Sequence, residues 1–66
     1  MSDHVKEIAV RLKTMREISG LTVEEMGERL TITAAEYARM ESGEIDIPVS
    51  VLCEAADIFG ISVTEL

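Results

Sequence analysis

Apolar residues recur along the chain at intervals of three and four positions, the spacing of an amphipathic helix. The first run consists of Val5, Ile8, Ala9, Leu12 and Met15. Ser2 or Asp3 can cap its start, and Gly20 can take the left-handed conformation that ends many helices. The pattern predicts a helix over about residues 3–18.

A second, shorter helix is predicted over about residues 23–29. Thr22 and Glu25 fit a capping box, in which a hydroxyl and a carboxylate three residues later each bind the other's backbone N–H. Gly27 provides a small residue where close contact with another helix would need one. The apolar positions of this segment are Val23, Met26 and Leu30.

A third helix is predicted over about residues 34–41, after a connection of only some four residues, 30–33. Thr33 and Glu36 form a second candidate box at its start. Ser42 and Gly43 end it. The residues expected to face inward are Tyr37 and Met40.

A fourth helix is expected to start around Pro48, which suits a first helical turn because its missing N–H would be unbonded there. Gly60 stops the helix, and residues 63–66 resemble the first turn of a fifth. The apolar stripe is Val49, Leu52, Ala55, Ala56 and Phe59. These elements predict an all-α fold, a compact bundle of four to five short helices forming one domain over residues 1–66.

Composition narrows the class of protein further. The sequence has only two aromatic residues among 66, so aliphatic and methionine side chains must fill the core. Cys53 is expected to pack beside the apolar stripe of the fourth helix. One cysteine excludes an internal disulfide and a multi-cysteine metal site. The N-terminal residues have no apolar signal segment, and no run approaches the length of a membrane span. We expect a cytoplasmic protein with no membrane contact.

The charge distribution argues against nucleic acid when taken alone. The net charge is −7, and residues 21–46 hold two arginines against seven acids, which gives −5. Residues 1–20 carry +1 and residues 47–66 carry −3. DNA-binding domains are usually basic, because cations that neutralise phosphates supply most of the non-specific affinity.

The order of the short helices nevertheless fits a helix-turn-helix over about residues 22–41. At these positions the chain resembles the Cro and phage-repressor-like regulators, also called the xenobiotic-response-element family, and thus a lambda-repressor-like DNA-binding domain. The resemblance covers nearly the whole chain. It rests on Arg16, the runs 20–26 (GLTVEEM), 30–33 (LTIT) and 37–43 (YARMESG), Ile47-Pro48, Leu52, 55–62 (AADIFGIS) and Glu65-Leu66.

The segment 41–48 (ESGEIDIP) resembles members that carry a C-terminal cupin barrel as a small-molecule sensor. That likeness implies a sensor domain outside this chain. The resemblance further implies a homodimer, or one module of a larger dimeric regulator, that reads double-stranded DNA with the third helix in the major groove.

Several residues are candidate DNA contacts by this resemblance. Arg39 is the only cation of the third helix, and its alternative is an exposed arginine paired with Glu36 or Glu44. Helix starts favour phosphates, although Thr22 and Thr33 can equally serve as caps alone. The predicted DNA-binding residues are Lys13, Thr22, Val23, Thr33, Ala34, Ala35, Glu36, Arg39 and Ser42, with Gly43 beside them.

The resemblance also implies that Arg16 and Glu41 form a structural salt bridge between the first helix and the end of the third. Three positions depart from the family pattern: Val23 replaces a glutamine that clamps DNA, Gly27 replaces an alanine, and Thr31 replaces a glycine. Thr31 in a left-handed conformation would cost about 1 kcal/mol.

Two functions are therefore carried forward. The first is a sequence-specific transcriptional regulator, and the second is a protein-interaction or antitoxin-like module on the same scaffold with weak or no DNA binding. The second function is suggested by the net charge of −5 over residues 21–46, which include the predicted helix-turn-helix. An enzyme is not expected, because the sequence has no nucleophile–base pair, phosphate-binding glycine loop or metal-ligand spacing, and no cofactor is implied.

Overall fold

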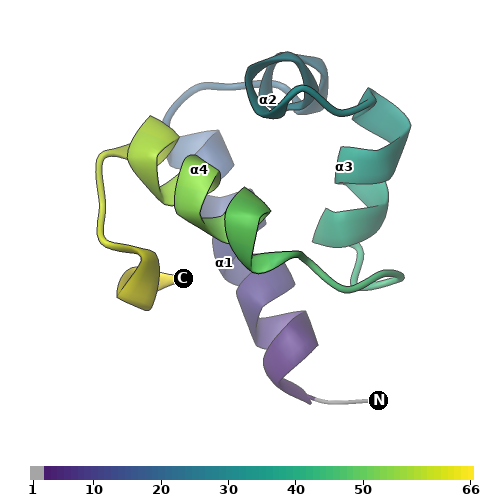
Figure 1. Ribbon diagram of the computed structural model, residues 1–66, viewed down its shortest axis with the longest axis vertical. Helices are drawn as coiled ribbons and strands as arrows, with labels where there is room; N and C mark the ends of the chain where they lie inside the picture. The colour runs from purple at the N-terminus through teal and green to yellow at the C-terminus, as the bar shows by residue number, and fades with distance from the viewer. Residues whose placement is uncertain (1–2) are drawn as a thin grey trace.

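The computed structural model describes residues 3–66, which form five helical elements (Figure 1). The expected cap by Ser2 or Asp3 and the expected core position Val5 lie outside the described side chains. The elements are α1 (Asp3–Ile18), α2 (Val23–Leu30), α3 (Ala34–Glu41), α4 (Val49–Phe59) and a short 3-10 turn, η1 (Val63–Glu65). The all-α prediction is confirmed within these residues. α1 and α3 have the predicted bounds, and α2 is one residue longer.

The helices surround one core. α2 and α3 pack against each other, α1 contacts α3 and α4, and α4 contacts α2 and η1. Figure 1 shows α1 running behind α4, with α3 to one side of the pair. Of the helices in residues 3–66, none combines the length and hydrophobicity that a bilayer span requires.

Leu12, Met26 and Tyr37 are the largest fully buried side chains, one each from α1, α2 and α3. Met26 and Met40 are buried as expected, and Met15 packs half-buried at the edge of the core. Burial of such apolar area stabilises the fold by about 25 cal/mol per Å². The remaining core residues are Leu30, Val51, Ala55, Ala56 and Leu66.

The predicted apolar stripe of α4 was partly wrong. Val49 is 74% exposed, and the buried residue near the start of the helix is Val51, at 8%. Cys53, expected to be packed, is exposed. Positions 49 and 53 each lie two residues from 51, about 200° round the helix, so burying Val51 turns both side chains outward. Pro48 is the N-cap residue, just before the first turn.

The end of the chain docks onto the core. Leu66 is buried there, and Arg11 Nη1 donates to the Leu66 carbonyl oxygen at 3.3 Å. Ser62 and Glu65 form a capping box in which Ser62 N–H donates to the Glu65 carboxylate at 2.9 Å. The turn expected at 63–66 is therefore present as η1.

Candidate nucleic-acid interface

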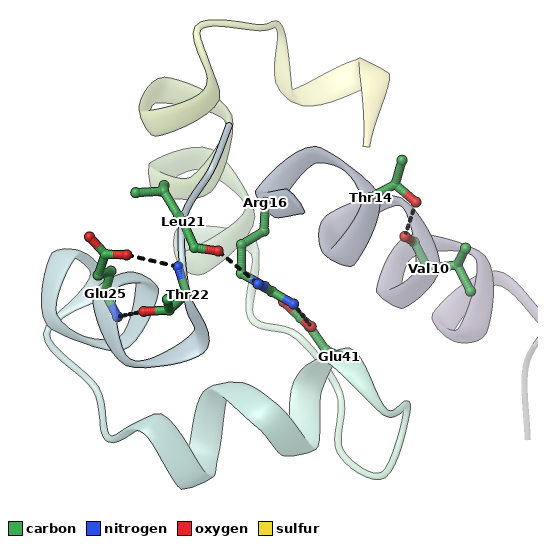
Figure 2. Close-up of polar contacts among 7 residues, drawn as sticks. All are labelled: Val10, Thr14, Arg16, Leu21, Thr22, Glu25 and Glu41. Carbon is green, nitrogen blue, oxygen red and sulfur yellow. Dashed lines mark hydrogen bonds and ion pairs between the residues drawn. The ribbon is translucent and has the colours of Figure 1, made fainter. Parts of the chain in front are cut away.

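The start of α2 has the predicted capping box. Glu25 N–H donates to the Thr22 hydroxyl at 3.1 Å, and Thr22 N–H donates to the Glu25 carboxylate at 3.0 Å (Figure 2). Acceptance of the Thr22 backbone hydrogen bond, aided by the Thr22 side chain, lowers the pKa of Glu25 below its ordinary value. The box fixes the first turn of α2 and leaves Thr22 exposed.

The connection from α2 to α3 is closed by backbone hydrogen bonds at Thr31 and Ile32. Thr31 has the expected left-handed conformation, with φ 60° and ψ 40°, and its N–H donates to the Glu28 carbonyl at 3.2 Å. Ile32 N–H donates to the Gly27 carbonyl at 2.9 Å. A Cβ on Gly27 would lie 3.0 Å from the Ile32 carbonyl oxygen and 3.2 Å from Ala34 N. The missing side chain thus lets the start of α3 approach α2.

At the start of α3, the Thr33 half of the predicted capping box is present. Glu36 N–H donates to the Thr33 hydroxyl at 3.0 Å, so Thr33 is the N-cap residue as expected. Tyr37 and Met40 face the core, also as expected. The exposed residues of α3 are Ala35, Glu36, Ala38 and Arg39.

Arg39 forms an exposed ion pair with Glu44, in the connection between α3 and α4. Arg39 Nε lies 3.3 Å from Glu44 Oε2, and the two side chains are 60% and 61% exposed. Ser42 caps the end of α3, and its hydroxyl donates to the Arg39 carbonyl at 2.9 Å. An exposed pair of this kind contributes little to stability, so Arg39 can leave Glu44 for another anion.

Arg16 and Glu41 form a bidentate pair between α1 and the last residue of α3 (Figure 2). Arg16 Nε donates to Glu41 Oε2 at 2.6 Å and Nη2 donates to Oε1 at 3.2 Å, with the side chains only 11% and 7% exposed. Arg16 Nη1 also donates to the Leu21 carbonyl at 2.7 Å. The hydrogen bond to Glu41 raises the pKa of Arg16, and burial opposes the rise. One guanidinium therefore ties α1 to the entrance of α2 and to the end of α3.

Tyr37 lies at the buried side of this pair. Its hydroxyl is buried without an aligned hydrogen bond among the described residues. Burial raises the pKa of Tyr37 above its ordinary value, the Glu41 carboxylate adds to the rise and Arg16 opposes it. The phenol therefore stays protonated and acts as a packing residue of the motif.

The sequence of this chain resembles that of a known protein family over most of its length. The model of a family described as a helix-turn-helix domain matches residues 7–66. The chain belongs to the helix-turn-helix domain family. Separate comparisons with curated proteins and with solved structures gave no match.

The candidate contacts occupy different depths of the helix-turn-helix. Thr22, Thr33 and Ser42 are exposed at helix ends, as are Ala35, Glu36 and Arg39 along α3. Lys13 is exposed on α1. Val23 and Ala34 are half-buried, because Val23 packs against the core and Ala34 lies where α3 approaches Gly27. The Leu21 carbonyl was missed as a second partner of Arg16, since a backbone acceptor leaves no side-chain signal in the sequence.

The surface of the helix-turn-helix is acidic. Glu24, Glu25 and Glu28 are all exposed on α2, with Arg29 as the single cation of that helix. α3 adds Glu36 and Arg39, and Glu44 already accepts a hydrogen bond from Arg39. The potential that this surface presents to a phosphate backbone is therefore weaker than that of a basic domain.

Proposed function

We propose that this helix-turn-helix domain is a sequence-specific DNA-binding transcriptional regulator that sets α3 in the major groove of double-stranded DNA. The observation that carries the proposal is the outward face of α3, exposed and held by Arg16 at a fixed angle to α1 and α2. A short rigid helix with a free polar face is what reads base edges in this class of motif.

In this proposal the contacts divide by chemistry. Thr22 and Thr33 stand at helix starts, where free N–H groups and the helix dipole favour a phosphate. Ser42 and Lys13 add contacts to the phosphate backbone. The remaining contacts are to bases: Arg39 to guanine, Glu36 to the amino group of cytosine, and the methyl groups of Ala34, Ala35 and Val23 to thymine.

The proposed regulator is a dimer, because two-fold proteins read half-sites about 10 bp apart and gain affinity from both. It acts in the cytoplasm as a homodimer or as one module of a larger dimeric regulator, in which a cupin barrel of the kind implied by residues 41–48 would sense an effector.

The test starts from a random duplex library, from which sites are selected and their affinities measured by fluorescence anisotropy. Arg39→Ala should weaken binding by about 1–3 kcal/mol and relax selectivity at one base position. Arg29→Ala, an exposed arginine on α2, is the matched control and should change affinity less. Circular dichroism should show both variants folded, since both side chains are exposed. Equal binding by Arg39→Ala and the parent would contradict the proposed role of α3.

The acidic surface favours a second candidate, a protein-interaction or antitoxin-like module on the same scaffold. Under this alternative Glu24, Glu25 and Glu28 repel DNA and contact a basic protein partner. Failure of the library to enrich any duplex would favour it. In either form we propose a binding role without catalysis. Among the side chains that the structure describes, from residue 6 on, His, Cys, Asp and Glu do not gather in threes that could hold a metal ion.

A further inference from the structure

The outer face of α1 carries an exposed ridge of Val10, Thr14 and Ile18. Val10 and Ile18 are 63% and 72% exposed, so two large apolar side chains of one helix face solvent on either side of Thr14. The Thr14 hydroxyl donates to the Val10 carbonyl at 2.9 Å (Figure 2), so its hydrogen bond is made within the helix. Residues four apart lie along one of the ridges by which helices pack.

A hollow adjoins this ridge. An open groove of about 310 Å³ is lined by Lys6, Glu7, Val10 and Arg11. These described residues belong to two neighbouring rows of α1, 6–10 and 7–11, and the groove runs along them beside Val10. A ridge and a groove on one face can fit a copy of the same face, as an isologous dimer requires.

We propose that α1 packs antiparallel against α1 of a second copy of this chain, about a two-fold axis that passes through Thr14. An α-helix turns by about 100° and rises by about 1.5 Å per residue. The axis therefore places Val10 of each copy at the same height along the helices as Ile18 of the other copy, once at each end of the contact. Ile18 of each copy then meets the groove beside Val10 of the other. The proposal deepens the proposed dimeric regulator by naming its dimer surface, and rests on it to that extent.

Charges on the flank of the ridge select the antiparallel orientation. Lys13 and Glu17 are exposed on the same side of the helix. The two-fold axis brings Lys13 within about 3 Å, measured along the helix, of both Glu17 and Lys13 of the copy. The attraction to Glu17 prevails, because Glu17 lies about 40° nearer than Lys13 to the centre of the contact face. A parallel pairing would instead place Lys13 at that spacing from Arg11 of the copy, with like charges side by side. One helix face is a small interface, so we expect a weak, concentration-dependent dimer.

Sedimentation equilibrium of the parent chain, from micromolar to millimolar concentration and without DNA, tests the dimer. We expect a monomer–dimer equilibrium that Ile18→Asp shifts toward monomer by about tenfold or more in Kd. Val49→Asp on α4 is the matched control, because Val49 is equally exposed, and it should leave the equilibrium unchanged. Thermal melts check that both variants fold. A parent chain that stays monomeric throughout, or equal effects of the two variants, overturns the proposal.

The orientation has its own test. Glu17→Lys should weaken the dimer, and the double variant Lys13→Glu with Glu17→Lys should restore it, because the pair is reversed as a unit. In a Cys53→Ser background, Thr14→Cys lies at the axis and should oxidise to a disulfide-linked dimer. Val10→Cys should not, because its counterpart is about 12 Å further along the helix. Cross-linking by Val10→Cys overturns the antiparallel arrangement.

These results separate the dimer surface from the proposed function. A dimer that enriches no duplex from the library overturns the regulator and leaves the α1 interface standing. A chain that binds DNA but is monomeric at all concentrations overturns the interface and leaves the regulator standing.

Discussion

The turn between α2 and α3 depends on two residues with opposite properties. Gly27 is helical and matters for the Cβ that it lacks, since that atom would meet the Ile32 carbonyl oxygen at 3.0 Å. Thr31 carries a side chain at φ 60°, where glycine is preferred. The chain therefore has a glycine where steric space requires it and a β-branched residue where the backbone would favour glycine.

Gly27→Ala should destabilise the domain although alanine is the better helix former. Propensity alone favours alanine by about 1 kcal/mol. Crowding against the backbone of Ile32 and Ala34 should exceed this gain and leave a net loss of about 1 kcal/mol or more. Urea unfolding measures the difference, with Ala38→Gly at an exposed site of α3 as the reference for propensity. A Gly27→Ala variant more stable than the parent would show that the turn relaxes at no cost.

Thr31→Gly should stabilise the domain by relieving the left-handed conformation. The expected gain is about 1 kcal/mol, or roughly 4–8 °C in Tm for a domain of this size. Thr33→Ala is the contrasting control, two residues on: it removes an N-cap hydroxyl and should cost about 1 kcal/mol. If Thr31→Gly melts below the parent, the packing of the threonine side chain outweighs its backbone strain.

At the scale of the elements, capping residues predicted where helices begin and end, and apolar periodicity predicted which helix faces are buried. The helix ends were predicted more accurately than the buried faces. α3 begins after Thr33 and ends before Gly43, as the local signals indicated, because each stop is made by a residue with a specific backbone role. The buried face of α4 was assigned wrongly. Eight of its eleven residues are apolar, Val49, Val51 and Cys53 among them, so the pattern does not show which face is buried.

Only Ser50, Glu54 and Asp57 are polar in α4. With so few polar positions, a stripe through Val49 and one through Val51 are equally continuous, and the sequence pattern does not distinguish them. The tertiary fold decides between them, because Val51, Ala55 and Ala56 are the residues of α4 that are buried in the core.

Glu41→Ala should lower the stability of the fold more than any surface change. Removing the carboxylate leaves the Arg16 guanidinium buried with only the Leu21 carbonyl as an acceptor. Loss of one member of a buried pair typically costs about 3–5 kcal/mol, a large share of the stability of a small domain. A double change of Arg16 and Glu41 to well-packed apolar residues should recover part of the loss.

The exposed pair of Arg39 and Glu44 is the matched control for this experiment. Glu44→Ala also removes an arginine partner, but at a site where both side chains are exposed, so it should change stability by less than about 1 kcal/mol. Thermal melts of these three variants and the parent compare the two pairs directly. If Glu41→Ala melts within about a degree of the parent, the buried pair does not hold α1 to α3.

At the scale of the whole molecule, the motif spacing located the candidate contacts but did not determine their exposure. Arg39 and Ser42 are exposed at the surface, whereas Val23 and Ala34 are half-buried. In an eight-residue helix a single turn faces both the core and the solvent, so neighbouring candidates differ in depth. The network that joins Arg16 to Leu21 and Glu41 spans 25 residues of sequence, and only the resemblance to a family suggested any part of it.

The net charge of −7 leads to the last prediction, a shallow salt dependence of DNA binding. Arg16 is held by Glu41 and the Leu21 carbonyl, so few cations near the motif are left for phosphates: Arg39, Arg29 and, where it is not paired with Glu17 of the second copy, Lys13. With about two or three phosphates neutralised per protomer, log affinity against log salt should have a slope of roughly −2 to −3. Anisotropy across a salt series measures it. Glu44→Gln should strengthen DNA binding, because the Arg39 guanidinium then no longer has to give up an ion pair with a carboxylate before it binds the DNA. A slope steeper than about −6 per protomer would show that further cations reach the DNA.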